Sequence, residues 1–212
     1  MAQNITFHVR VAADDNLHAV MRTAFQYNRC IFTTVSAIAA RSDRSLKCGS
    51  LFSLIPADMQ LLKREAAQMS AILAPKGLSL RLIDVGSGRI LCYMFRHAQL
   101  STMLSGSREA AFLKELGYSS LAVSDAVDTL CARLSTGGDF PHEVGLFLGY
   151  PVEDVIGFIE NKGKNCLCCG CWKCYSNACA AQKAFDKFRK CTNVYKRLFA
   201  CGRSINQLAV AS

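Results

Sequence analysis

The chain has 212 residues, of which 51% are hydrophobic and 19% are charged. This composition excludes a disordered, collagen-like or low-complexity chain, and the length suffices for one large domain or two small ones with a real hydrophobic core. The 25 lysines and arginines outnumber the 16 acidic residues and give a net charge of +9.

The positive charge and most of the cysteines lie at the C-terminal end of the chain. Residues 1–160 hold 15 basic and 15 acidic side chains, whereas residues 161–212 hold 10 basic side chains and one acidic residue, Asp186. The same segment contains 8 of the 12 cysteines. We therefore expect a neutral α+β body over 1–160 and a basic, cysteine-rich loop followed by helices over 161–212, packed on the body as one domain.

The chain start does not resemble a secretory signal. It lacks a basic segment followed by an apolar run, and no apolar stretch approaches the roughly 20 residues that cross a bilayer. The sequence therefore predicts a cytoplasmic protein without a membrane partner. In a reducing compartment, cysteines are metal ligands, redox groups or small hydrophobic residues before they are disulfides.

The first predicted elements are a short strand and two helices. Apolar and polar residues alternate from Ile5 to Val11, and apolar residues recur at helical spacing from Leu17 to Phe25. A further helix is predicted to start near Pro56, which suits a first helical position, and to stop at Pro75-Lys76-Gly77. Its apolar face consists of Met59, Leu62, Ala66, Met69 and Leu73.

An antiparallel hairpin is predicted next. Leucines alternate with polar residues from Leu78 to Leu82, and a turn at Gly86-Ser87-Gly88 leads into a strand over 90–95. Short helices are expected at about 97–104 and 108–116.

Two longer helices complete the pattern. The first is predicted to be capped by Ser124 and stopped by Gly137-Gly138. The second ends before Gly202, and Ser204-Ile205-Asn206-Gln207 has the form of a capping box that opens a short terminal helix. The elements together predict a helix-rich α+β single domain with a small antiparallel sheet and a basic, cysteine-rich C-terminal helical segment. The apolar stripe of the long helix consists of Ala181, Ala184, Phe185, Phe188, Cys191, Val194, Tyr195 and Leu198.

Several blocks in the second half of the chain resemble the signature of a bacterial family. The main block runs from His142 to Pro151 and continues through Glu153-Asp154-Val155, Gly157-Phe158-Ile159 and Asn161-Lys162-Gly163-Lys164-Asn165. The family is catalogued only as domain of unknown function 3793. The resemblance extends from about Lys47 to the end and implies a bacterial, cytosolic protein, without implying an activity. Further matching positions are Ser50-Leu51-Phe52, Trp172-Lys173, Tyr175, Lys190-Cys191-Thr192 and Gly202-Arg203-Ser204.

Five cysteines stand within the nine residues 166–174. Cys166-x2-Cys169 forms one knuckle, and the triple that begins at Cys168 has the two-residue spacing of iron–sulfur ligand runs. Gly170 would ease the turn, because glycine tolerates positive φ. The pattern predicts an iron–sulfur cluster or a zinc ion, with a fourth thiolate from Cys179, Cys191 or Cys201. The candidate metal ligands are Cys166, Cys168, Cys169, Cys171, Cys174, Cys179 and Cys191.

Two other interpretations of this cysteine block stay open. Free cysteines are often buried as small hydrophobic residues. A pair of thiols can also form a redox-active dithiol.

A second candidate site lies at 142–154. His142 and Glu143 precede an apolar stretch where a helix should begin, and Tyr150 and Asp154 follow at the start of the next helix. These four residues are candidate catalytic groups of an enzyme, or of a protein that binds a small ligand. The alternative is a capped corner between two helices.

The last long helix is the third candidate. Lys183, Lys187, Lys190 and Arg197 share a helix face and could contact the phosphates of a nucleic acid. Such a face can also serve as an interaction surface for a protein, or can simply be solvated. Phe185 and Phe188 fall on the apolar face, so they do not form a platform for stacking bases.

Overall fold

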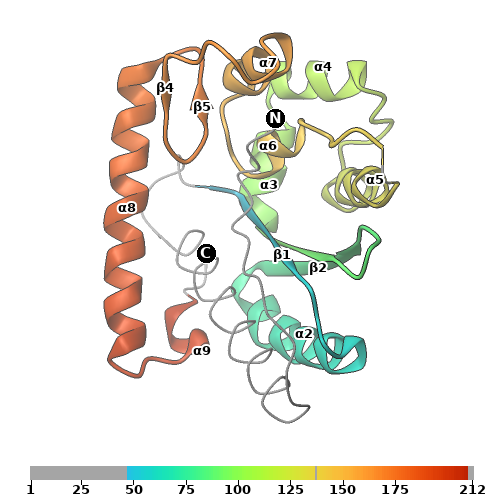
Figure 1. The fold of residues 1–212 in the computed structure, drawn as a ribbon, viewed down its shortest axis with the longest axis vertical. Coiled ribbons are helices and arrows are strands. Elements are labelled where there is room, and N and C mark those ends of the chain that lie inside the picture. The colour runs from blue at the N-terminus through green and yellow to red at the C-terminus, as the bar shows by residue number, and fades with distance from the viewer. Residues whose placement is uncertain (1–46, 137, 210–212) are drawn as a thin grey trace.

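The computed structural model describes residues 47–136 and 138–209, so the predicted elements at 5–11 and 17–25 lie outside the described residues. A three-stranded antiparallel sheet with the order β1–β3–β2 lies at its centre (Figure 1). The strands are β1 (Gly49–Leu54), β2 (Leu78–Asp84) and β3 (Ile90–Arg96). The middle strand β3 is buried along its whole length, as expected for a strand with neighbours at both edges and helices on both faces.

The β2–β3 hairpin confirms the prediction from the leucine alternation. Leu78 pairs with Arg96 and Asp84 with Ile90, so both strands are slightly longer than expected. Gly86 and Gly88 have φ values of 78° and 68°, which glycine adopts without steric cost. The Asp84 carboxylate accepts a hydrogen bond from the backbone N–H of Gly86 at 2.9 Å and closes the turn.

One face of the sheet is covered by helix α2 (Met59–Leu73). The helix begins after Asp58, whose carboxylate accepts hydrogen bonds from two first-turn N–H groups at 2.8 and 3.1 Å. The predicted start at Pro56 is therefore too early, because an aspartate cap outweighs the preference of proline for a first turn. The helix passes into the 3₁₀ turn η1 (Ala74–Lys76) and ends at Gly77, as predicted. The predicted apolar face is confirmed by the burial of Leu62, Ala66, Met69 and Leu73.

The opposite face of the sheet is covered by helices α3 (His97–Leu104), α5 (Val123–Ser135), α6 (Val144–Phe147) and α7 (Val152–Glu160), with α4 (Ser107–Glu115) beside them. The helices predicted at 97–104 and 108–116 are confirmed. Helix α5 starts one residue before Ser124, whose hydroxyl bonds the Asp125 carboxylate at 3.2 Å and caps no backbone amide. The predicted cap at Ser124 is therefore wrong.

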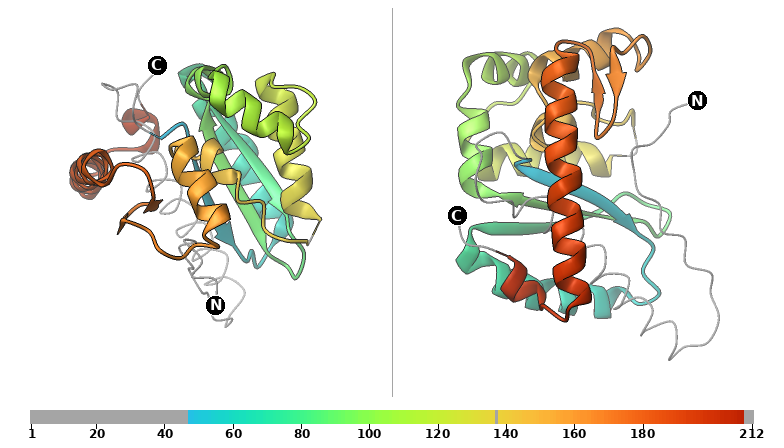
Figure 2. Two further views of the ribbon diagram at one scale, coloured as in Figure 1. Left: turned by 90° about the horizontal axis from the view of Figure 1, so that it is seen from above. Right: turned by 90° about the vertical axis from the view of Figure 1, so that its left-hand side faces the viewer.

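The C-terminal part consists of the short hairpin β4 (Cys168–Cys169) and β5 (Lys173–Cys174), the long helix α8 (Ala178–Ala200) and the short helix α9 (Ile205–Leu208). Figure 2 shows α8 running along the outside of the molecule. The capping box is confirmed, since the Ser204 N–H donates to the Gln207 side chain and the Gln207 N–H donates back to the Ser204 hydroxyl. In the described part of the chain, no helix combines the length and the apolar character needed to cross a membrane.

The predicted apolar stripe of α8 is only partly correct. Ala181, Phe185 and Phe188 are buried, but Val194 is 54% and Leu198 is 38% exposed. The buried residues recur every three or four positions and so share one face of the helix. Val194 and Leu198 fall on the other side. The class is nevertheless the predicted one, a helix-rich α+β fold with a small antiparallel sheet.

Candidate functional site

The cysteine-rich hairpin is anchored to α7 by the carboxylate of Asp154, which is 3% exposed. One oxygen, Oδ1, accepts hydrogen bonds from the N–H of Tyr175, the N–H of Ser176 and the Ser176 hydroxyl at 2.8, 2.9 and 2.8 Å. The other, Oδ2, accepts a bond from the Trp172 indole N–H at 2.7 Å. All four donors come from the hairpin and the segment that follows it, so one side chain ties this region to the body.

The hydrogen bonds also set the charge of Asp154. Burial by itself raises the pKa of a carboxyl group, but the donors on Tyr175, Ser176 and Trp172 outweigh it and hold the pKa below the ordinary value of 3.8. The group is therefore ionised at neutral pH, and its oxygens are engaged within the protein. In this geometry both oxygens of Asp154 hold the hairpin region to α7, and its role as a candidate catalytic residue stays a prediction.

An aromatic cluster packs the hairpin against α8. The Trp172 ring stacks on Tyr150 at 5.2 Å between centroids and meets Phe185 edge-on at 4.6 Å and Phe188 edge-on at 6.2 Å. A Cβ atom at Gly170 would lie 2.3 Å from the Phe185 ring. Gly170 does not have a positive φ, so the structure needs a glycine here for close packing and not for the turn geometry expected from the sequence.

The cysteines alternate between the two faces of the hairpin. Cys168 pairs with Cys174 across the ladder, and Cys169 pairs with Lys173. Cys174 is fully buried in the aromatic cluster, and both Cys168 and Cys171 pack against that cluster. Cys169 is exposed. Outside the hairpin strands, Cys179 is exposed, Cys166 and Cys191 are half-buried, and these thiols are free.

This alternation explains why the thiols do not converge on one point. Within residues 47–136 and 138–209, no group of three or more histidine, cysteine, aspartate or glutamate side chains is placed to hold a metal ion. The prediction of a metal centre assumed a loop that wraps around the ion. In a hairpin, neighbouring residues such as Cys168 and Cys169 point to opposite faces.

Two residues near the thiols were not found from the sequence. The ammonium group of Lys47 lies 5.7 Å from the centre of the Tyr150 ring and 5.5 Å from that of Phe188. Burial lowers the pKa of Lys47, and the neighbouring Cys171 acts in the opposite direction. No local signal could have predicted this contact, because Lys47 is distant from the hairpin in sequence.

The second residue is Tyr175, whose hydroxyl oxygen is buried without a hydrogen-bond partner among the described residues. Burial raises its pKa, and the nearby thiols of Cys166 and Cys169 raise it further. A tyrosine directly after a cysteine block is the only sequence signal for it.

Tyr150, in contrast, was a sequence candidate. Its hydroxyl donates to the backbone carbonyl of Cys171 at 3.2 Å, and burial raises its pKa, so it remains a protonated donor.

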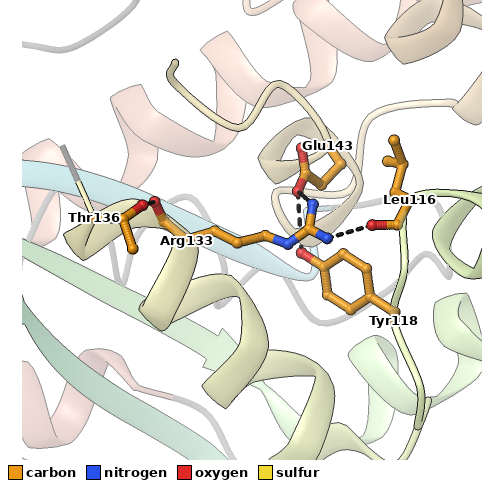
Figure 3. Close-up of polar contacts among 5 residues, drawn as sticks. All are labelled: Leu116, Tyr118, Arg133, Thr136 and Glu143. Atoms are coloured by element: carbon orange, nitrogen blue, oxygen red, sulfur yellow. Dashed lines mark hydrogen bonds and ion pairs between the residues drawn. The ribbon is translucent and has the colours of Figure 1, made fainter. Parts of the chain in front are cut away.

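Glu143 lies in a different set of contacts, which Figure 3 shows. The Glu143 carboxylate is 4% exposed and accepts hydrogen bonds from Arg133 at 2.9 Å and from the Tyr118 hydroxyl at 3.3 Å. Arg133 also donates to the Leu116 carbonyl and lies 4.8 Å from the centre of the Tyr118 ring. His142 is exposed and meets the edge of the Phe158 ring at 5.0 Å. The structure therefore does not bring His142 and Glu143 together as a base and its orienting group.

Comparison with known proteins identifies a family but gives no activity for it. The family model described as "Protein of unknown function (DUF3793)" matches residues 37–209. No curated protein and no solved structure matches the chain.

Proposed function

The chain belongs to this family of unknown function, and we propose that it is a thiol–disulfide redox protein whose reactive pair is Cys168 and Cys174. The observation that carries the proposal is the direct pairing of these two residues across the β4–β5 ladder. Directly opposed residues in an antiparallel pair have Cα atoms about 4.5–5.5 Å apart. This separation lies within the roughly 4.4–6.8 Å that a disulfide spans.

The different exposure of the two thiols supports different roles. Cys168 is half-buried, so an incoming disulfide can reach it, whereas Cys174 is fully buried. Burial raises the pKa of Cys174, although the N–H groups of Asn177 and Ser176 act against this effect. Cys168 is therefore the attacking thiol and Cys174 the resolving thiol of the proposed reaction.

The oxidant is a disulfide of a small thiol or of another protein. The Cys168 thiolate attacks one sulfur of this disulfide, and the other sulfur leaves as a thiolate and takes up a proton. The Cys174 thiolate then attacks the Cys168 sulfur, and the second sulfur of the oxidant leaves in the same way. The hairpin loses two electrons and gains one S–S bond, and the oxidant becomes two thiols.

The test is an equilibration of the full chain in buffers of reduced and oxidised glutathione, followed by alkylation and peptide mass spectrometry. Trypsin cleaves after Lys173, so a Cys168–Cys174 bond links two separate peptides. Oxidation should also change the fluorescence of Trp172, the only tryptophan, which lies in the same cluster as both thiols.

Three variants make this test specific. Cys168→Ser should abolish both the link between the peptides and the fluorescence change, without disturbing the packing around this half-buried residue. Cys174→Ser should have the same two effects if the variant folds. Cys179→Ser, which removes an exposed thiol from the second peptide, should leave both intact. A hairpin that stays reduced at every glutathione ratio, or that first forms a different bond, would contradict the proposal.

A bound metal is a second candidate, favoured by a different observation. The Cys166-x2-Cys169 knuckle lies beside the buried Tyr175 hydroxyl, which has no hydrogen-bond partner in the part of the chain that the structure describes. The two thiolates and this oxygen could hold a zinc ion or an iron centre. The remaining ligands would come from outside these three residues. In competition with a chromophoric chelator, Cys166→Ser and Cys169→Ser should remove zinc binding by the reduced protein, and Cys168→Ser should not. Substoichiometric zinc and iron in anaerobically prepared wild-type protein would exclude this candidate.

A further inference from the structure

The outward face of α8 carries a row of three lysines, followed by two apolar residues with an arginine between them. The steps from Lys183 to Arg197 are three or four residues, and Leu198 follows Val194 by four, which places all of them on one side of the helix. All six are exposed, Val194 by 54% and Leu198 by 38%. We call this the α8 outer face, and it consists of Lys183, Lys187, Lys190, Val194, Arg197 and Leu198.

The α8 outer face is separate from the packed face of the same helix. Ala181, Phe185 and Phe188 are buried against the hairpin cluster on the other side. Figure 2 shows α8 along the outside of the molecule over its whole length. The exposed apolar residues therefore do not pack in this part of the chain, and with the lysines beside them they form a face that a partner can cover.

The charge of this region selects an acidic partner. Residues 161–212 hold 10 basic side chains and a single acidic one, Asp186, which pairs with Arg189 on the same helix. Three lysines follow one another along the N-terminal half of the α8 outer face. A partner with carboxylates at matching positions would therefore gain both attraction and correct register.

The apolar end of the face favours a protein over a nucleic acid. A phosphodiester backbone offers no apolar group to contact Val194 and Leu198. Phe185 and Phe188 are buried, so they do not stack on bases. The three- and four-residue spacing is also the spacing by which one helix packs along another.

We propose that the α8 outer face binds an acidic amphipathic helix of a partner protein. Carboxylates of that helix lie over Lys183, Lys187 and Lys190, and apolar side chains lie over Val194 and Leu198. This inference is independent of the redox proposal, since it uses none of the thiols.

The probe is a designed helical peptide with glutamates at three positions and leucines at two, spaced to face the α8 outer face. Its binding to the full reduced chain is measured by fluorescence anisotropy at low and physiological salt. Lys183→Glu, Lys187→Glu and Lys190→Glu combined should weaken binding at least tenfold. The matched control, Lys63→Glu, Arg64→Glu and Lys114→Glu, makes the same change of charge at exposed positions of α2 and α4 and should leave binding unchanged.

Two further experiments distinguish binding to a docking face from general electrostatic attraction. Val194→Ser with Leu198→Ser should weaken the peptide at least fivefold without changing the net charge. A peptide of the same composition in scrambled order should bind at least tenfold more weakly. Equal binding of both peptides, or tighter binding of duplex DNA or RNA that ignores the serine changes, would overturn the proposal. Circular dichroism of each variant verifies that the exposed substitutions leave the fold intact.

Discussion

Two buried carboxylates, Glu143 and Asp154, stand close together in the sequence but are held in different ways. Glu143 is paired with the guanidinium of Arg133 and with a phenol, whereas Asp154 is surrounded by neutral donors from the hairpin region. Both were candidates for catalysis. Asp154 uses both of its oxygens to join segments of the fold, whereas Arg133 and Tyr118 both donate to the same oxygen of Glu143, Oε1. A buried carboxylate whose two oxygens both accept hydrogen bonds within the fold has none left for a substrate, and this describes Asp154.

The two regions also differ in how much structure depends on the carboxylate. Arg133 is partly exposed and keeps its bond to the Leu116 carbonyl without Glu143. The Trp172 indole that donates to Asp154 is buried, so solvent replaces this acceptor less readily. We expect this contrast to appear in four measurements.

The largest effect is expected for Asp154→Ala. The substitution leaves the donors of Trp172, Tyr175 and Ser176 without their acceptor, and the loss should be about 3–5 kcal/mol in the free energy of unfolding. Urea unfolding followed by Trp172 fluorescence measures it. Asp186→Ala, on the exposed side of α8, is the control and should cost less than about 0.5 kcal/mol. A loss below about 1 kcal/mol for Asp154→Ala would show that the hairpin does not depend on this anchor.

A smaller loss is expected for Glu143→Ala, about 2 kcal/mol, because solvent and the Leu116 carbonyl still satisfy much of Arg133. Glu143→Gln should lose less, since an amide oxygen can still accept a hydrogen bond from Tyr118. Both values come from the same urea titration. If Glu143→Ala costs more than Asp154→Ala, the contrast between the two regions is reversed.

The pH dependence of stability should also differ between wild type and Asp154→Asn. Because the folded-state pKa of Asp154 is lowered, its stabilisation is fully present above the ordinary value of 3.8 and is lost as the pH falls through the folded-state value. The melting temperature of the wild type should therefore decline more steeply than that of Asp154→Asn as the pH falls below about 4. If the melting temperatures of both proteins decline in parallel, Asp154 is not the source of the pH dependence.

The smallest effect is expected for His142→Ala. His142 is exposed and contributes an edge contact with the Phe158 ring, so the change should be within about 0.5 kcal/mol. Differential scanning calorimetry against wild type is sufficient to measure it. A loss above 1 kcal/mol would mean that this histidine supports the corner in a way that its contacts do not explain.

The elements with a local signal could be predicted from the sequence. The β2–β3 hairpin follows from leucine alternation and two glycines, and the terminal capping box follows from Ser204 and Gln207 alone. Strand β1 was missed because its residues do not alternate cleanly. Phe52, Ser53 and Leu54 are all buried, since both faces of the strand are covered.

The candidate site was only half predictable. The sequence identified the cysteines, but the spacing between them does not distinguish a loop around a metal from a hairpin that sends them to opposite faces. The bond partners of Asp154 follow it by 18 to 22 residues, which is too distant for any periodic pattern. Only the packed structure brings this carboxylate to Trp172 and Ser176.

The contact between Gly170 and Phe185 fixes the position of the hairpin along α8. A shift of the hairpin by one residue would bring the side chain of Cys169 or Cys171 to the ring, where there is no room even for a methyl group. Such a slip would also exchange the inward and outward cysteines, because successive strand residues alternate in direction. Because Gly170 has no side chain, only this register fits against Phe185, and the register fixes which cysteine thiols face each other and which face the solvent.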